Sequence, residues 1–246
     1  MDWDAPAVVL DVRPFGEGDA IATVLAAEHG AYRGLARGAQ SRTRTATWQP
    51  GNLVQARWVA RLADQLGSLT AELVHPAAAL VMDDALALAT LSSACAVAEG
   101  ALIEREPHPR IFDGLIRLIA YLAQGPQSLA DLVRWEAALL ADLGYGLDLT
   151  TCAVTGSAGN LHYVSPRTGR AVSEDGAGLY KTRLLPLPAF LLIDHPGCPA
   201  EWRDGLRLTG HFLARDAFGQ HHRPLPLARV ALYHRVCDLA TEPENA

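Results

Sequence analysis

Residues 7–35 decide the N-terminal fold, and they read AVVLDVRPFGEGDAIATVLAAEHGAYRGL. Three short apolar runs alternate in this stretch with breaks that contain glycine. The runs cover residues 7–12, 21–25 and 32–35, and a fourth run of the same kind covers residues 53–59. Apolar runs of this length between turn residues are typical of antiparallel β-strands. So many strands in so few residues predict a small closed barrel.

Among small barrels, the five-stranded OB-fold is the one most associated with single-stranded nucleic acid. We therefore expect residues 1–80 to form an OB-fold barrel. The whole chain has 246 residues, of which 50% are hydrophobic and 20% charged. These values are typical of a well-cored globular protein of about two modest domains.

The residues around and beyond the third run carry an unusual charge pattern. Residues 31–61 contain no Asp or Glu, although the formal net charge of the chain is -6. The same stretch holds six arginines: Arg33, Arg37, Arg42, Arg44, Arg57 and Arg61. Guanidinium groups without counter-charges are free to meet phosphates, where release of condensed counterions favours binding. The alternative is a general preference for arginine, since Lys181 is the one lysine of the chain, but that preference does not explain the missing acids.

Two tryptophans accompany these arginines. Arg42 and Arg44 lie on a polar segment, residues 38–47, directly before Trp48. An exposed aromatic ring beside arginine can stack a base while the guanidinium neutralises the backbone. Trp48 and Trp58 are, however, more often core residues than stacking platforms, and both interpretations stay open.

Helical periodicity replaces the strand pattern after His75-Pro76, which places a domain boundary near residue 80. Asp83 and Asp84 can cap a first helix, and Ser128 with Asp131 resembles a capping box. The expected helices cover residues 84–104, 109–124, 128–144, 200–215 and 227–240. We predict an α+β multidomain protein in which an all-helical domain, residues 81–146 and 186–246, is interrupted by an irregular insertion, residues 147–185.

The insertion has the outline of a treble-clef-like zinc module that has lost its ligands. Cys152 stands at the first ligand position, but Thr155, Ser173 and Gly176 stand where the other thiolates would be. Because structural zinc takes four ligands, we expect no metal and no cofactor, and hydrogen bonds must hold the loop. The other three cysteines, Cys95, Cys198 and Cys237, form no C-x-x-C pair, so we expect reduced thiols, with Cys95 a small core residue.

Patterns typical of enzymes and membrane proteins are weak. The nearest match to a phosphate-binding P-loop has Tyr180 where glycine is needed, and Gly156-Ser157-Ala158-Gly159 is one residue short of a nucleophile elbow. The pair His221-His222 lacks a metal-ligand spacing. No apolar run approaches the roughly 20 residues of a membrane span, and the N-terminus lacks a basic signal region. We expect a cytoplasmic, nucleoid-associated protein that is not an enzyme and does not bind membranes.

Taken in order, a set of short motifs resembles the RecO family of bacterial recombination-repair mediators. Each motif is weak alone, but their order and spacing along nearly the whole chain are fairly specific. They are residues 7–10 (AVVL), 13–17 (RPFGE), 36–39 (ARGA), 48–51 (WQPG), 134–136 (RWE), 139–140 (LL), 143–146 (LGYG) and Cys152. The resemblance implies an N-terminal OB-fold, a helical domain and a zinc-finger-like insertion. Several family members hold zinc there through four cysteines, whereas this sequence keeps only Cys152.

The resemblance also implies a function without bond-making chemistry. RecO-like proteins bind single- and double-stranded DNA, anneal complementary strands, and help RecR to load RecA onto single strands coated by single-stranded-DNA-binding protein (SSB). We expect DNA contact from five arginines: Arg33, Arg37, Arg42, Arg44 and Arg57. The alternative is a helical adaptor that binds only proteins and uses the arginine-rich segment for an acidic partner.

RecO-like proteins also take the acidic C-terminal tail of SSB on the helical domain. Such a tail requires an apolar groove with a cation at its rim. We expect Leu115, Arg117 and Arg134 to supply it. The competing interpretation makes the apolar residues core and pairs Arg134 with Asp131 or Glu136.

Overall fold

The computed structural model describes residues 1–62, 65–122, 125 and 128–241. The chain divides into two compact units, Met1–Gly125 and Pro126–Ala246. The predicted end of the second helix, near Gln124, lies outside the described residues.

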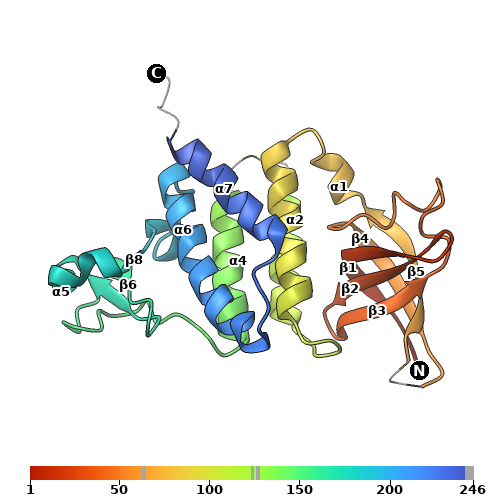
Figure 1. The fold of residues 1–246 in the computed structure, drawn as a ribbon, viewed down its shortest axis with the longest axis horizontal. Helices are drawn as coiled ribbons and strands as arrows, with labels where there is room; N and C mark the ends of the chain where they lie inside the picture. The colour runs from red at the N-terminus through yellow and green to blue at the C-terminus, as the bar shows by residue number, and fades with distance from the viewer. Residues whose placement is uncertain (63–64, 123–124, 126–127, 242–246) are drawn as a thin grey trace. The chain divides into compact units, whose positions relative to one another are not determined.

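Five strands form a closed barrel in the first unit, with neighbour order β1-β2-β3-β5-β4 (Figure 1). The strands are β1 (Asp2–Phe15), β2 (Asp19–Ala26), β3 (Gly30–Ala36), β4 (Leu53–Val59) and β5 (Gly67–His75). The expected α+β fold with an N-terminal OB-like barrel of five strands is confirmed. The long β1 makes this closure possible because its first half pairs with β4 and its second half with β2.

The barrel closes where β3 and β5 meet as a short parallel pair through Gly34 and Gly67. A β-carbon on Gly34 would lie 2.6 Å from that of Leu69, and one on Gly67 would overlap the Trp58 ring. Both positions therefore require glycine. Trp58 fills the barrel core, and its indole N–H donates to the Arg33 carbonyl at 3.0 Å.

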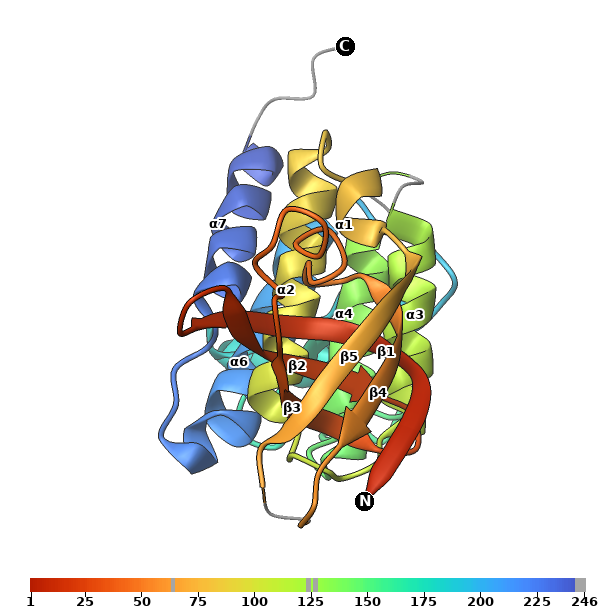
Figure 2. The same cartoon turned by 90° about the vertical axis from the view of Figure 1, so that its right-hand side faces the viewer.

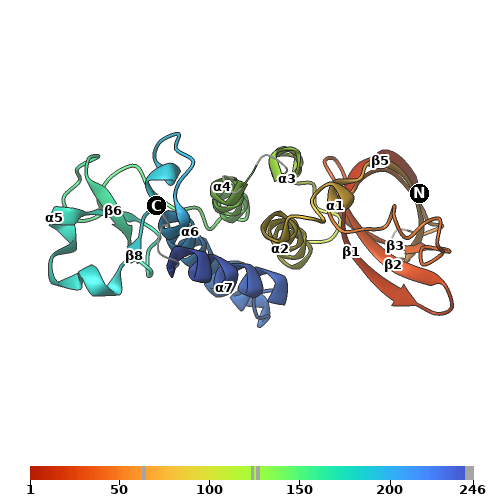
Figure 3. The ribbon, with the colours of Figure 1, turned by 90° about the horizontal axis from the view of Figure 1, so that it is seen from above.

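Three helices follow the barrel within the first unit: α1 (Ala77–Leu80), α2 (Ala85–Ala101) and α3 (Pro109–Tyr121). Asp84 caps α2 as predicted, because its carboxylate accepts the Leu86 and Ala87 amides at 2.8 and 3.0 Å. α2 packs against β1 and α3 packs against β2, so these helices lie on one side of the barrel (Figures 2 and 3). Cys95 of α2 is buried, as expected.

Three longer helices build the second unit: α4 (Ser128–Asp142), α6 (Pro199–Phe212) and α7 (Leu227–Thr241). A buried ion pair joins them, since Arg229 donates to both oxygens of Glu136 at 2.5 and 3.0 Å. Thr209 of α6 donates to the same carboxylate at 2.5 Å. The Arg229 guanidinium also donates to the Leu206 carbonyl at 2.7 Å.

The insertion between α4 and α6 contains a small sheet, so it is more regular than its glycine-rich sequence suggests (Figure 1). Its strands are β6 (Leu161–Val164), β7 (Ala171–Ser173) and β8 (Leu185–Pro186), in the order β7-β6-β8. Two short helices, α5 (Glu174–Ala177) and η2 (Gly178–Arg183), connect β7 to β8.

Candidate nucleic-acid interface

The strands of the barrel differ in how much of their surface is open to solvent. Nucleic acids usually bind an OB-fold over strands 2 and 3. Here almost every residue of β2 is buried, and Glu99 of α2 pairs with Arg33 of β3 at 3.1 Å. β4 and β5, by contrast, alternate buried and exposed residues. The β4–β5 face and the segment that leads into it are therefore more open than the β2 side of the barrel.

An open hollow of about 490 Å³, here called the arginine hollow, lies on the β4–β5 face. It collects side chains from β1, β4, β5 and the segment between β3 and β4. Its lining comprises Asp4, Arg37, Arg44, Thr47, Trp48, Gln55, Arg57, Leu69, Thr70, Ala71 and Glu72. Three of the five predicted DNA-binding arginines thus meet in one hollow.

Strand register and loop hydrogen bonds place these three arginines. Arg57 of β4 lies between Asp4 of β1 and Thr70 of β5 in the pairing register. Arg44 reaches back along its own loop, and its Nη1 donates to the Arg37 carbonyl at 2.9 Å. All three arginines are exposed, and none of them forms an ion pair within the part of the chain that the structure describes.

The loop that carries Arg37 and Arg44 is tied to the barrel. The Asp19 carboxylate accepts the Gly38 amide at 2.7 Å, and the Asp19 carbonyl accepts the Gln40 side chain at 2.9 Å. Asn52 donates to the Ala46 carbonyl at 2.7 Å from the other end of the loop. These bonds hold the arginine-bearing loop in place, which limits the conformational entropy that ligand binding would cost.

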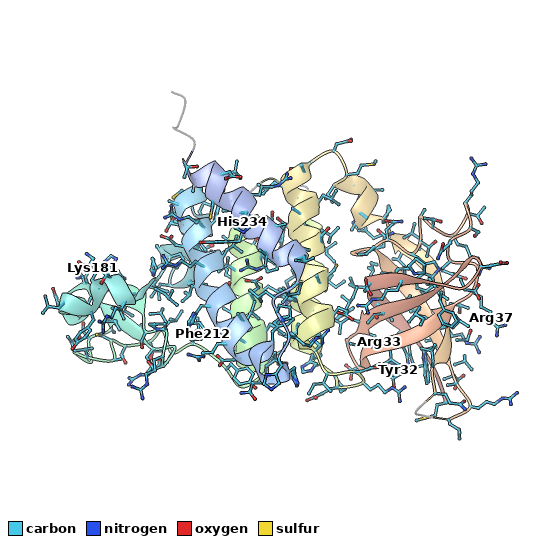
Figure 4. The ribbon with its side chains drawn as sticks, viewed as in Figure 1. Tyr32, Arg33, Arg37, Lys181, Phe212 and His234 are labelled. Carbon is cyan, nitrogen blue, oxygen red and sulfur yellow. The ribbon has the colours of Figure 1, made fainter. Side chains whose placement is uncertain are left out.

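The other two predicted arginines lie elsewhere. Arg33 and Arg13 both pair with Glu99, at 3.1 and 3.3 Å, so the acid missing from residues 31–61 is supplied from α2. Arg33 lies on the part of the barrel nearer α2, and Arg37 lies farther from that helix (Figure 4). Arg42 is exposed on the loop but does not line the arginine hollow.

The arginine hollow also contains acidic side chains, although residues 31–61 contain none. Asp4 and Glu72 line the arginine hollow because strand pairing brings them beside β4. Two acids against three arginines leave a positive excess of one in the lining.

Trp48 and Trp58 are 5% and 1% exposed, so they are core residues and neither offers an open stacking face.

Of the three residues predicted to hold the SSB tail, one is buried and one has structural partners. Leu115 of α3 is fully buried, whereas Arg117 on the same helix is exposed. Arg134 of α4 donates to Asp131 at 2.8 Å and to the carbonyls of Phe190 and His195 at 3.1 and 2.7 Å. The competing interpretation, in which Arg134 pairs with Asp131, is the arrangement found.

The four positions of the degenerate zinc module do come together. Cys152 Sγ accepts hydrogen bonds from the amide and the hydroxyl of Ser173, both at 3.2 Å, and from the Thr155 amide at 3.4 Å. A β-carbon on Gly176 would lie 2.9 Å from the same sulfur. These residues do not fit structural zinc, because one thiol and two hydrogen-bonded hydroxyls cannot replace four strong ligands. Among the residues that the structure describes, no group of three or more His, Cys, Asp or Glu side chains could hold a metal.

The hydrogen bonds around Cys152 change its acidity. Burial raises the pKa of this thiol, but the bonds from Ser173 and Thr155 together outweigh burial and lower the pKa to about 6. Cys95 lacks such donors, and burial raises its pKa to about 12. The lowered pKa favours the thiolate form of Cys152, which is the stronger hydrogen-bond acceptor.

Comparison with known proteins identifies the family. The family model for the recombination protein O N terminal matches residues 1–77, and the model for the recombination protein O C terminal matches residues 82–224. The chain belongs to the RecO family. The DNA repair protein RecO of Granulibacter bethesdensis is 61% identical over 250 residues, and the comparison covers 100% of both chains. The DNA repair protein RecO of Rhodospirillum rubrum is 43% identical over 243 residues, with 96% of each chain covered.

The expected membership of the RecO family is thus confirmed. The match of the N-terminal family model coincides with the barrel and that of the C-terminal model begins just before α2. Within the described ranges, no helix combines the length and the apolar character that a membrane crossing needs.

Proposed function

We propose that the protein is a DNA-binding recombination mediator for DNA repair that anneals complementary strands. The observation that carries this proposal is the arginine hollow, where Arg37, Arg44 and Arg57 meet on the β4–β5 face of the barrel without ion-pair partners among the described residues. Family membership supports it, because the similar proteins of other bacteria are named DNA repair proteins.

Strand annealing neither makes nor breaks a covalent bond. Two anionic backbones approach each other when cations neutralise part of their charge and hold them together. Guanidinium groups suit this task because they grip phosphate oxygens bidentately and remain charged at every physiological pH. No side chain needs to accept or donate a proton in such a reaction, so the proposed function is not that of an enzyme.

The test is a triple variant, Arg37→Ala, Arg44→Ala and Arg57→Ala, compared with wild type in oligonucleotide binding and in annealing of complementary strands. Each missing charge-assisted hydrogen bond costs about 1.5–3 kcal/mol, so affinity should fall at least about tenfold and annealing should slow in parallel. A matched control replaces the exposed Arg167, Arg207 and Arg235 by alanine, which changes the net charge equally. An adaptor without DNA binding would show no oligonucleotide binding in any of the three proteins.

We further propose that the protein works with RecR, contacts the acidic tail of SSB and thereby helps to load RecA. Arg117 is the best candidate for contact with the tail, because it is exposed, whereas Arg134 has three partners within its own unit. Replacing Arg117 by Glu should weaken binding of an SSB-tail peptide several-fold in fluorescence anisotropy, and naked-DNA affinity should change far less. Equal peptide affinity in variant and wild type would place the tail elsewhere.

A further inference from the structure

A second hollow adjoins the arginine hollow and differs from it in chemistry. It has a volume of about 330 Å³ and shares the Trp48 side chain with the arginine hollow. Its lining comprises Val12, Ala39, Gln40, Thr45, Trp48, Gln49 and Pro50. None of these described residues is charged, so this second hollow, here called the neutral hollow, does not suit a phosphate.

Two side-chain amides give the neutral hollow a defined hydrogen-bonding character. Gln40 Nε2 donates to the Asp19 carbonyl at 2.9 Å, and Gln49 Nε2 donates to the Thr45 carbonyl at 2.9 Å. Each amide nitrogen thus uses one of its two N–H groups within the protein and keeps the other. The two amide oxygens have no hydrogen-bond partner among the described residues. Each amide therefore keeps an acceptor oxygen and a second N–H donor, so the residues that line the hollow offer both kinds of polar group beside apolar walls.

We propose that the neutral hollow receives an unpaired nucleobase of the strand whose phosphates lie along the arginine hollow. This inference rests on the proposed DNA binding and adds a strand preference to it. A nucleobase is neutral and flat, with apolar faces and polar edges, which matches the lining in charge and polarity. The phosphates of the strand then lie at Arg37, Arg44 and Arg57, and one of its bases lies in the neutral hollow.

Two expectations follow from this arrangement. A base that is paired and stacked in a duplex must first be unstacked to enter such a hollow, which costs a few kcal/mol, so single strands should bind more tightly than duplexes. Cytosine and thymine each present hydrogen-bond donors and acceptors on the edge that is exposed when the base is unpaired. Because the two amides keep both an acceptor and a donor, the hollow should accept either base with similar affinity.

The first experiment uses the full wild-type chain and fluorescein-labelled strands of equal length at pH 8 and one salt concentration. Strands of dC and dT should bind with affinities within about twofold of each other, because either base can pair with the two amides. A strand of abasic sites keeps the phosphates but lacks the bases, and it should bind at least about fivefold more weakly than dC. Equal affinity for abasic and dC strands would overturn the proposal.

A variant localises the effect to the neutral hollow. The double change Gln40→Leu and Gln49→Leu should reduce the advantage of the dC strand over the abasic strand by roughly two- to tenfold, because each net hydrogen bond is worth about 0.5–1.5 kcal/mol. The affinity for the abasic strand should stay within about twofold. Gln65→Leu removes an exposed amide outside both hollows, and this control should keep the full advantage. A double variant that keeps the wild-type advantage would show that the bases bind elsewhere.

Failure of this inference can be told apart from failure of the proposed function. If only the neutral hollow is wrong, the Arg37, Arg44 and Arg57 triple variant still loses affinity while abasic and dC strands bind equally. If DNA binding itself is wrong, the triple variant and wild type behave alike with every strand.

Discussion

Arginine plays opposite roles in the two units of this protein. In the second unit, Arg229 is 1% exposed and its charge is matched by Glu136, which is fully buried. In the first unit, Arg37, Arg44 and Arg57 line an open hollow and have no ion-pair partner among the described residues. The same side chain stabilises helix packing in one place and remains available for a ligand in the other.

This difference shows that the number of arginines in a segment does not define a binding site. Arg33 belongs to the arginine-rich segment, yet it shares Glu99 with Arg13 and faces α2. Burial and pairing in three dimensions separate the structural arginines from those that are free to bind. Variants that replace a paired or an unpaired arginine test this difference directly.

The largest effect is expected in the second unit, from Arg229→Met. This change leaves the Glu136 carboxylate buried without its counter-charge, which typically costs about 3–5 kcal/mol of unfolding free energy. Urea denaturation followed by circular dichroism measures this destabilisation. The double variant Arg229→Met with Glu136→Leu serves as control, because it removes both charges and should recover much of the stability. A decrease below about 1 kcal/mol in the single variant would show that the ion pair does not hold α4, α6 and α7 together.

An intermediate effect is expected in the insertion, from Cys152→Ala. The folded pKa of Cys152 is lowered to about 6, against about 8.5 for an unfolded thiol. A lowered pKa stabilises the fold above the unfolded value, and this contribution disappears as the pH falls through about 6. Wild type should therefore gain stability over Cys152→Ala between pH 6 and pH 8.5, by about 1.5–3 kcal/mol for hydrogen bonds to a charged group. Parallel stability curves for the two proteins over this range would contradict the assignment of a thiolate.

A smaller effect distinguishes two arginines of the same segment. Arg57→Gln should weaken oligonucleotide binding about threefold or more, because Arg57 lines the arginine hollow. Arg33→Gln should change binding less than about twofold, because Arg33 is already paired with Glu99. Fluorescence anisotropy under one set of salt conditions compares the two variants directly. Equal weakening in both would mean that DNA follows the α2 side of the barrel as well.

The last prediction concerns the zinc content of the purified protein, for which we expect a value near zero. Cys152 is the one thiol of its module, and the hydroxyls of Thr155 and Ser173 are 3.4 Å apart. Purified protein should therefore carry no stoichiometric zinc after dialysis. Elemental analysis that finds about one zinc ion per chain would overturn this expectation.

Local sequence patterns predicted much of the fold. Four of the five strands and the starts of α2, α3, α4 and α7 were predicted from turn residues, capping residues and periodicity. The fifth strand, Gly67–His75, was not identified, although Leu69, Ala71 and Leu73 alternate along it. Barrel closure depends on its short parallel pairing with β3, which joins Gly34 to Gly67 and is a contact that a local pattern does not contain.

The candidate site was only partly predictable for the same reason. The sequence drew attention to Arg37, Arg44 and Arg57, which line one hollow. It gave no sign that Glu99, 66 residues away from Arg33, would pair with that arginine. Nor did it show that strand pairing would bring Asp4 beside Arg57. Long-range pairing decides which charges are free, and the charge sequence alone cannot reveal it.

The central claim is that the arginines of the hollow meet DNA phosphates, and the salt dependence of oligonucleotide binding tests it most directly. The logarithm of the binding constant should fall linearly with the logarithm of the salt concentration in wild type. In the Arg37, Arg44 and Arg57 triple alanine variant, the slope should become shallower by up to about 0.7–0.9 for each phosphate that is no longer neutralised by an arginine. The Arg167, Arg207 and Arg235 control should keep the wild-type slope. A folded triple variant with the wild-type affinity and slope would contradict the claim.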